Sequence, residues 1–351
     1  MKAPTMTPLP LRNIIMRSMQ LTAFDLDHLK LTDLPAPRPG PNEVLVRMEA
    51  AALNYRDLML VSGQLYRGVQ LPIAPVSDGA GTVLEVGEAV TRFKPGDRVT
   101  TFYKSLWLAG SMRPEWEGAE IGGPAQGVMR ELACFDAYSL VRAPSSMSNL
   151  QAATLPIAAL TAWQALEQAR ITTGQTVLLL GTGGVSIFAL QFAKLRGAKV
   201  ILLSSSNEKL ARAKALGADI GINYNEVPQW GSVVREATGG IGVDAVIETV
   251  GASTFAQSLQ AVRMHGFIGV VGFMGGNDAQ LALIPMILKR VRVQGISVAP
   301  LEQHERMVDA LEATQLQPVL DKVFGFEQLP AAFEYLKAGK HFGKIGIDFA
   351  L

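Results

Sequence analysis

The chain has 351 residues, of which 48% are hydrophobic and 18% charged, and its formal net charge at pH 7 is +1. This length predicts about two domains, and this balance is typical of a folded protein with a sizeable core, which excludes a largely disordered chain. A charge so close to zero gives no indication of a nucleic acid or an anionic membrane surface as a partner.

The cysteine content and the N-terminal segment narrow the class further. A single cysteine, Cys134, excludes intramolecular disulfides and any four-cysteine zinc site. Prolines interrupt the N-terminus where a signal peptide needs an apolar run. No apolar stretch approaches the roughly 18 residues of a membrane span. We therefore expect a protein of the cytoplasm.

The first part of the chain is predicted to be rich in β-strands. The stretch "EVLVRMEAAALN" alternates apolar and polar residues, and "AGTVLEVGEAV" and "GDRVTTF" are short strand-like runs between glycine and proline turns. The stretch 104–127 that follows is long for a loop and carries Trp107, Met112 and Trp116 among glycines. Such loops are usually functional, so this one is expected to form a substrate lid or a dimer contact.

After about residue 150 the pattern changes to alternating strands and helices. The strand-like runs are "QTVLLLG", "AKVILLS", "DAVIETVG", "FIGVVGF" and "VRVQGISV", and the helical ones include "VSIFALQFAKLRG" and "NEKLARAKALGA". This alternation predicts parallel βαβ units and a doubly wound sheet. We therefore predict an α/β protein in which a nucleotide-binding domain, residues 153–302, is inserted into a β-rich domain formed by residues 1–152 and 303–351.

The motif "VLLLGTGGVSIFALQFAK" is the strongest signal in the chain. Gly181, Gly183 and Ser186 occupy the three positions of a GxGxxG fingerprint, with Gly184 and Val185 between the last two. The glycines allow a tight turn and bring backbone N–H groups close to a pyrophosphate at the start of a helix. No "GK[ST]" follows, which argues against a nucleoside-triphosphate loop. The context therefore predicts a dinucleotide site.

Three serines stand where an NAD-binding unit usually carries an acid for the ribose 2′-OH. Hydroxyls at Ser204, Ser205 and Ser206 can donate to a 2′-phosphate, and Lys209 in the next helix adds positive charge. The alternative is that the serines only cap that helix. We favour NADP(H) as the cofactor, with Tyr224 beside its adenosine phosphate.

Nearly the whole chain resembles the medium-chain dehydrogenase/reductase superfamily, and within it the zinc-independent quinone oxidoreductase-like branch. The resemblance is carried by "PNEVLVRMEAAALNYRDLMLVSG", "DGAGTVLEVGEAVTRFKPGDRV", "AATLPIAALTAWQAL", "GTGGVSIFALQFAK", "KALGAD" and "HFGKIGI". It implies a GroES-like catalytic domain, an inserted Rossmann domain and hydride transfer with a nicotinamide cofactor. In this branch a lysine and a tyrosine at the spacing of Lys209 and Tyr224 hold the 2′-phosphate.

The departures from the zinc-dependent alcohol dehydrogenases of this superfamily predict that no metal is bound. Asn54, Ser77 and Ile157 stand where those enzymes carry zinc ligands. The four histidines, His28, His265, His304 and His341, show no ligand spacing and are expected at the surface.

The resemblance also implies the remaining site residues. Tyr66 resembles the family's tyrosine near the substrate and is the expected proton donor, although a loop aromatic without a catalytic role is the alternative. Asn54 is expected to orient substrate and nicotinamide ribose. The residues expected along the cofactor are Thr161, Gly272, Phe273 and Lys344.

Three functions follow from these residues. The first is an NADPH-dependent reductase of an activated C=C bond or a quinone; the second is a zinc-independent alcohol or aldehyde dehydrogenase; the third is a non-catalytic NADPH-binding sensor. Residues 291–298 would form the last strand of the parallel sheet, and its open edge predicts a homodimer.

Overall fold

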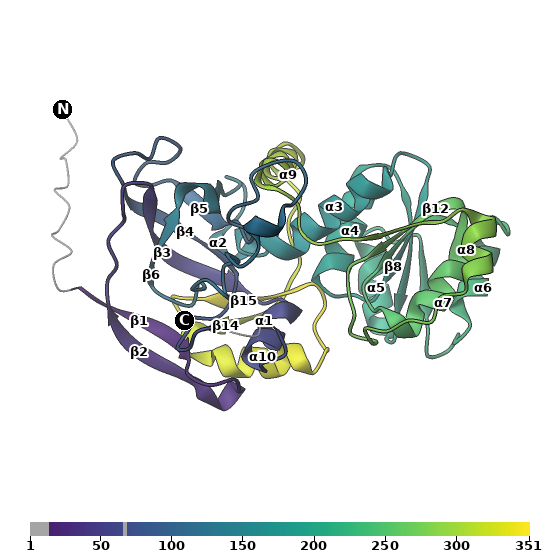
Figure 1. Cartoon of the computed structure of the whole chain (residues 1–351). Helices are drawn as coiled ribbons and strands as arrows, with labels where there is room; N and C mark the ends of the chain where they lie inside the picture. The colour runs from purple at the N-terminus through teal and green to yellow at the C-terminus, as the bar shows by residue number, and fades with distance from the viewer. Residues whose placement is uncertain (1–13, 66–68) are drawn as a thin grey trace.

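The structure is a computed structural model that describes residues 14–65 and 69–351 (Figure 1). Two sheets dominate it, one mixed and one parallel, and they lie in opposite halves of the molecule with helices between them (Figure 1). This confirms the predicted class, a GroES-like domain combined with a Rossmann-type parallel sheet. Tyr66, the expected proton donor, lies outside the described residues.

The mixed sheet has seven strands in the order β14-β15-β3-β4-β5-β7, with β6 paired to β3. It brings the first part of the chain together with its end, because β15 runs antiparallel to β3, with Gly346 opposite Ala52. A separate hairpin, β1–β2, covers one end of the sheet (Figure 1). The strands of this half are β1 (Ile15–Leu21), β2 (Leu29–Pro35), β3 (Glu43–Ala52), β4 (Asp78–Val86), β5 (Arg98–Thr101), β6 (Leu132–Asp136), β7 (Leu140–Arg142), β14 (Leu320–Gly325) and β15 (Lys344–Asp348).

The second sheet is parallel and has six strands in the order β10-β9-β8-β11-β12-β13. The chain reverses direction across the sheet between β8 and β11, which is the switch point at which nucleotides bind in such folds. The strands are β8 (Thr176–Leu180), β9 (Lys199–Ser204), β10 (Ile220–Asn223), β11 (Val243–Glu248), β12 (Val262–Val270) and β13 (Arg292–Gly295).

Helices pack on both sheets. They are α1 (Tyr55–Val61), α2 (Asn149–Ala152), α3 (Leu160–Ala169), α4 (Gly184–Leu195), α5 (Asn207–Ala215), α6 (Trp230–Ala237), α7 (Ala252–Ala261), α8 (Leu283–Lys289), α9 (Leu301–Thr314) and α10 (Leu329–Lys337). For example, α10 packs against β14 and β15, and α4 packs against β8 and β9. Short helical segments η1 (Leu26–His28), η2 (Pro114–Trp116), η3 (Ala137–Ser139), η4 (Leu155–Ala159) and η5 (Phe326–Gln328) complete the chain, and η4 is π-helical. None of the helices in the described residues is long and apolar enough to cross a membrane.

The structure corrects the predicted surface position of two histidines, because His341 is half-buried and His304 is fully buried. His304 lies in α9 and is fully buried against Phe102, with a ring-centroid distance of 6.1 Å. Helical spacing places it on the apolar face with Leu301, Met307 and Leu311, which are also buried. Burial lowers the pKa of His304 to about 3, so the ring is neutral at physiological pH.

The long stretch 104–127 is packed down on the molecule. Trp107 is buried in the same apolar cluster as α3 and α9, and Met112 and Trp116 pack against that cluster. Backbone N–H groups of Leu301 and Glu302 donate to the carbonyls of Trp107 and Leu108. These contacts fix the stretch to the start of α9, and its expected role as a substrate lid or a dimer contact stays a prediction.

Candidate active site

The glycine-rich turn between β8 and α4 has the geometry of a pyrophosphate cradle. Gly181 has a φ of 74°, which glycine adopts without strain, and Gly183 is the N-cap of α4. The hydroxyl of Ser186 donates to the carbonyl of Leu180 at 2.7 Å and ties the helix to the strand. A side chain at Gly184 would meet Lys344 Cδ at 2.7 Å. The turn therefore fits a dinucleotide, whose pyrophosphate would lie at the N-terminus of α4 beside Val185.

The last strand of the chain reaches this turn. Gly183 and Gly343 form an isolated bridge, and the N–H of Gly343 donates to the carbonyl of Thr182 at 2.9 Å. The segment at the start of β15 therefore supports the glycine-rich turn through these backbone contacts. Lys344 follows directly, and it is only 3% exposed.

The three serines have different surroundings at the end of β9. Ser204 is buried and accepts a hydrogen bond from the N–H of Ser206 at 3.3 Å. Ser206 caps α5 by accepting the N–H of Lys209 at 3.3 Å. Ser205 is exposed directly after the end of β9, and Tyr224 directly follows the neighbouring strand β10, with 41% of its surface exposed. Two serines therefore have local structural roles, and Ser205 presents its hydroxyl to solvent.

Lys209 reaches across to the other half of the molecule. Its Nζ donates to the carbonyls of Gly339 at 3.1 Å and His341 at 3.0 Å. Burial lowers the pKa of Lys209 and also lowers that of His341, to about 4, with Lys209 and Lys344 as further causes for the histidine. The expected phosphate-binding cation is therefore part of a contact between α5 and the segment before β15.

Asn54 is the centre of a buried polar cluster where the two sheets approach each other. Its Oδ1 accepts a hydrogen bond from Lys344 Nζ at 2.6 Å, and its Nδ2 donates to Asp78 Oδ2 at 2.8 Å. Lys344 Nζ also donates to the carbonyl of Leu53 at 2.6 Å and lies 3.7 Å from Asp78 Oδ2. Burial raises the pKa of Asp78 to about 7, although Lys344 and Asn54 act in the opposite direction. Burial also lowers the pKa of Lys344.

A second set of contacts extends this cluster along α1. The buried carboxylate of Asp57 accepts the N–H of Asn54 at 2.9 Å, the hydroxyl of Ser77 at 3.1 Å and Arg56 Nη1 at 3.1 Å. The guanidinium of Arg56 lies over the ring of Tyr103, 5.2 Å from its centroid. Two cations and two acids therefore share a small buried volume.

The positions expected to replace zinc ligands do converge in space. Asn54 donates to Asp78, and the backbone N–H of Ile157 donates to the same carboxylate oxygen at 3.4 Å. Ser77 is linked to Asn54 through Asp57. The described residues hold no group of three or more histidine, cysteine or acidic side chains that suits a metal ion. One carboxylate, an amide, a hydroxyl and a nearby ammonium do not make a zinc ligand set.

The residues expected beside the nicotinamide lie at the ends of neighbouring elements. Thr161 is buried in the first turn of α3. Gly272 follows β12, where a side chain would clash with the carbonyl of Thr249. Phe273 is 42% exposed and contacts Tyr55 edge to face, with centroids 6.3 Å apart. This contact links α1 of the mixed-sheet half to the parallel sheet.

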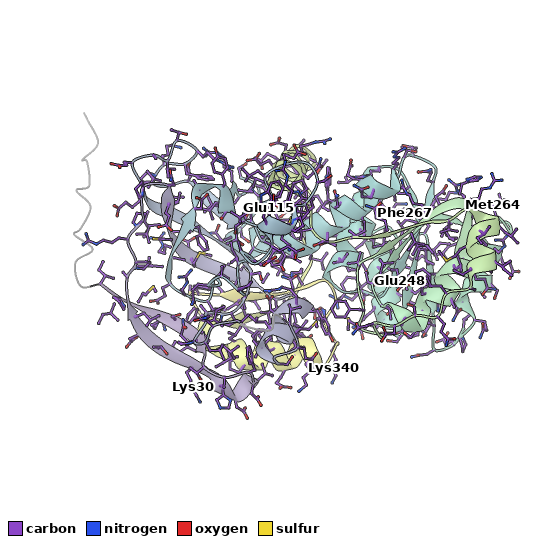
Figure 2. All side chains as sticks on the ribbon, in the orientation of Figure 1. Lys30, Glu115, Glu248, Met264, Phe267 and Lys340 are labelled. Carbon is purple, nitrogen blue, oxygen red and sulfur yellow. The ribbon has the colours of Figure 1, made fainter. Side chains whose placement is uncertain are left out.

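Sequence reasoning missed several buried acids and bases. The residues singled out from the sequence include neither Asp78 nor Arg56. Glu248, at the end of β11 (Figure 2), is fully buried and accepts the N–H groups of Val250 and Gly251, both at 3.0 Å. A charged residue directly before or after a buried strand is the signal that would have drawn attention to Asp78 and Glu248.

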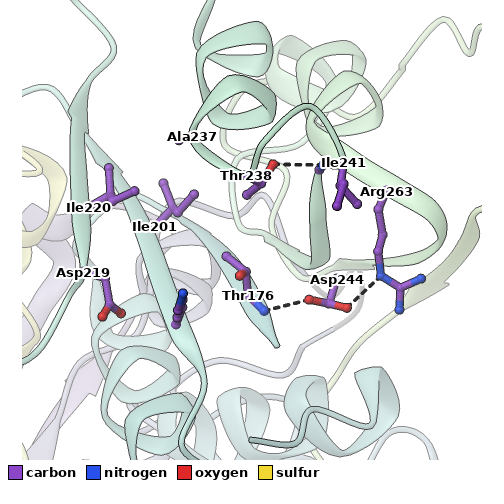
Figure 3. A pocket seen from close by; sticks show the side chains of 11 residues that line it. Thr176, Ile201, Asp219, Ile220, Ala237, Thr238, Ile241, Asp244 and Arg263 are labelled. Atoms are coloured by element: carbon purple, nitrogen blue, oxygen red, sulfur yellow. Dashed lines mark hydrogen bonds and ion pairs between the residues drawn. The ribbon is translucent and has the colours of Figure 1, made fainter. Parts of the chain in front are cut away.

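A second pocket lies at the starts of the parallel strands, and its acidic side chains are not available for catalysis (Figure 3). The acidic side chains of this pocket make structural contacts: Asp244 accepts the N–H of Thr176 and pairs with Arg263 at 2.7 Å. Asp219 likewise accepts the N–H of Val200 and pairs with Lys194. These side chains close the starts of the strands, so the candidate site remains the cluster around Asn54.

A glycine cradle on a parallel sheet, facing a buried polar cluster on a second sheet, defines a dinucleotide-dependent oxidoreductase. Comparison with known proteins agrees. Residues 40–145 match the family model "Alcohol dehydrogenase GroES-like domain", and residues 184–313 match "Zinc-binding dehydrogenase".

Two curated relatives extend over most of the chain. The zinc-type alcohol dehydrogenase-like protein C1773.06c of Schizosaccharomyces pombe is 41% identical over 91% of this chain and 94% of its own length. The acryloyl-coenzyme A reductase of Metallosphaera sedula is 31% identical over 90% of this chain and 95% of its own length.

Solved structures give the same result. A candidate alcohol dehydrogenase from Sinorhizobium meliloti 1021 is 40% identical with a TM-score of 0.91, covering 95% of this chain and 99% of its own. An NAD-dependent alcohol dehydrogenase is 32% identical with a TM-score of 0.86, covering 95% and 99%. The chain belongs to the medium-chain dehydrogenase/reductase superfamily. It is an oxidoreductase of that superfamily, for which a nicotinamide cofactor is typical.

Proposed function

We propose that this protein is an NADPH-dependent, zinc-free oxidoreductase that reduces an activated C=C bond or a quinone, as in the quinone oxidoreductase-like branch. The observation that carries the proposal is the cluster of Asn54, Asp78 and Lys344. An ammonium stands 2.6 Å from the amide at the first ligand position, and it would repel a divalent cation there. A carbonyl or enone would then be activated by hydrogen bonds rather than by a metal.

The arrangement of residues supports hydride transfer at the end of β12. When bound, the nicotinamide supplies the hydride. The cradle of Gly181, Gly183 and Gly184 would hold the pyrophosphate, and Thr161, Gly272 and Phe273 would bound the nicotinamide. The contact between Phe273 and Tyr55 narrows the site on the solvent side, which limits access of water to the reacting atoms.

The preference for NADPH is supported by the chemistry at the end of β9. The exposed hydroxyl of Ser205 and the phenol of Tyr224 would flank a 2′-phosphate, and residues 204–206 include no acid, the nearest in sequence being Glu208 in the first turn of α5. Lys209 would add its charge from α5, for which it must leave the carbonyls of Gly339 and His341. Reduction of an activated C=C bond is further supported by the name of the acryloyl-coenzyme A reductase relative.

The test is oxidation of NADPH and NADH with a naphthoquinone, an enone, an enoyl thioester and an aldehyde, before and after treatment with a chelator. The proposal expects turnover of the quinone or one of the C=C substrates, a lower Kd for NADPH than for NADH, and rates unchanged by the chelator. Turnover of the aldehyde alone would favour the zinc-independent alcohol or aldehyde dehydrogenase. That alternative is supported by the relatives that are named as alcohol dehydrogenases. Binding of NADPH without turnover would indicate a sensor.

We also propose that two copies of the chain form a homodimer through β13 and α8. β13 is the last strand of the parallel sheet, so one of its edges is free to pair. Beside it, α8 exposes Leu283, Ile284, Ile287 and Leu288, each by 63–70%. Met264 extends this apolar surface at the same end of the molecule (Figure 2). A second copy related by a two-fold axis would cover this surface and continue the sheet.

A further inference from the structure

We propose that Asp78 is the acid of this reduction: its Oδ1 carries the proton that the substrate takes up, while Asn54 and Lys344 hold the carboxyl in position. The inference rests on the proposed reductase function and assigns the proton source within that site. It makes Asp78 a catalytic residue, and Asn54 and Lys344 positioning residues.

The two oxygens of Asp78 have different surroundings. Oδ2 accepts Asn54 Nδ2 at 2.8 Å and the N–H of Ile157 at 3.4 Å, and Lys344 Nζ lies 3.7 Å away. Oδ1 is buried and has no hydrogen-bond partner among the described residues. A carboxyl oxygen that is shielded from water and receives no donor is the one on which a proton is retained. That proton would then be available to a molecule bound beside it.

The N–H groups of the neighbouring side chains are already engaged in hydrogen bonds. Lys344 directs two of its three N–H bonds to Leu53 and Asn54, and Asp78 is the remaining acceptor within 3.7 Å. Both ends of the Asn54 amide are engaged by Lys344 and Asp78. Asp57 accepts three donors, from Asn54, Arg56 and Ser77. Within this cluster, Asp78 is the acid with an oxygen, Oδ1, that has no hydrogen-bond partner among the described residues.

The charges around Asp78 suit an acid that must lose and regain a proton. Lys344 from β15 favours the carboxylate, Asp57 from α1 opposes it, and burial favours the neutral acid, so that the pKa lies at about 7. β3 places Ala52 opposite Asp78, and its charged residues are Glu43, Arg47 and Glu49, of which Arg47 and Glu49 pair at 2.8 Å. Neither α2 nor η4, which also pack against β4, carries a charged side chain. β5 carries Arg98, which binds Asn149 and lies opposite Thr82, away from Asp78.

The step balances without a further reactant. The hydride adds to one end of the C=C bond, and the O–H bond of Asp78 breaks with its electron pair remaining on Oδ1 while the proton joins the other end. The substrate gains two electrons and two hydrogens in total. Asp78 is left as a carboxylate beside the ammonium of Lys344, and water returns the proton after the product has left.

The first experiment is the pH dependence of kcat/KM for the wild type, Asp78→Asn, Lys344→Met and Lys344→Arg. The pH profile of the wild type should have an alkaline limb, in which kcat/KM falls about tenfold per pH unit above about pH 7, where Asp78 ionises. Asp78→Asn should lower kcat/KM by roughly 100-fold or more and remove this limb. Lys344→Met removes the cation that favours the carboxylate, so the limb should move to higher pH, whereas Lys344→Arg should leave it in place.

Asp97→Asn is the matched control, because Asp97 is also largely buried and ion-paired, but with Lys94 and Arg142 away from the site. It should leave the limb unchanged. If Asp78→Asn keeps both the rate and the limb, the proton comes from elsewhere, Tyr66 being the first alternative, and the assignment is overturned.

A second measurement does not depend on turnover. The infrared spectrum of the wild type should contain the C=O band of a protonated carboxylic acid at pH 6 that weakens by pH 8 and is absent from Asp78→Asn. In Lys344→Met this band should persist to higher pH, which tests the assignment even if Asp78→Asn does not fold. A band without turnover of any substrate would refute the reductase function alone; no band at pH 6 would refute the acid role of Asp78.

Discussion

Replacing Lys344 by methionine tests whether the buried cluster works as an ion pair. Methionine preserves much of the side-chain volume but removes the ammonium. Lys344 is 3% exposed and Asp78 is not exposed at all, so the variant leaves a buried carboxyl without its cation. Where the remaining group stays charged, breaking a buried pair in this way destabilises a protein by about 3–5 kcal/mol.

This cost should depend on pH with a definite sign. In the wild type Asp78 ionises at about pH 7, and loss of Lys344 raises the pKa of the carboxyl further. Above pH 7 the folded variant therefore retains a proton that the unfolded chain, with its ordinary carboxyl, has released. The stability of the variant falls relative to the wild type by about 1.4 kcal/mol per pH unit until its own pKa is passed. Below pH 7 both carboxyls are neutral and the difference is constant.

Urea unfolding of both proteins at pH 6, 7 and 8 measures this difference. Lys289→Met is the matched control, because Lys289 Nζ donates to the carbonyls of Leu259, Gln260 and Val262 and to no carboxylate. Its destabilisation should not change over this pH range. Equal destabilisation of Lys344→Met at pH 6 and pH 8 would refute the ion pair as the source of the effect.

Three further results are expected. Ser205→Asp should raise the Kd for NADPH about tenfold or more, with a smaller effect on NADH, because a carboxylate repels the 2′-phosphate; equal effects in a fluorescence titration would contradict the coenzyme assignment. Ile287→Glu should give a monomeric mass in light scattering, since this 70% exposed side chain lies on the proposed dimer surface, and an unchanged dimer would exclude α8 from the interface. His304→Leu should remove part of the loss of stability below pH 6.5, because the folded wild type resists protonation of this ring, by up to about 1.4 kcal/mol per pH unit; parallel stability curves at pH 4.5–7 would argue otherwise.

The sequence was most informative where structure depends on local signals. The turn from Gly181 to Ser186 requires glycine at defined positions, and the strand–helix alternation around it is visible in the spacing of apolar residues. Both were therefore predictable. The burial of His304 was also visible, since it falls on the apolar face of its helix with Leu301 and Met307, but its residue type suggested the surface.

The polar cluster could not be predicted in the same way. Asn54 and Lys344 were each expected at the site, but 290 residues separate them, and their contact depends on the pairing of β3 with β15. The role of Asp78 depends on which of its oxygens finds a donor, which only the three-dimensional arrangement determines. The coenzyme preference of Ser205 and the donor role of Tyr66 stay predictions.

The pairing of β15 with β3, and its bridge to the glycine turn, has a consequence for biosynthesis. Lys344 and Gly343 leave the ribosome long after Asn54 and Gly183. Until then the mixed sheet lacks an inner strand, Asn54 lacks its cation and the cofactor turn lacks its support. The site therefore assembles only after β15 has been translated, and a nascent chain with an exposed sheet edge must be protected from association during that time.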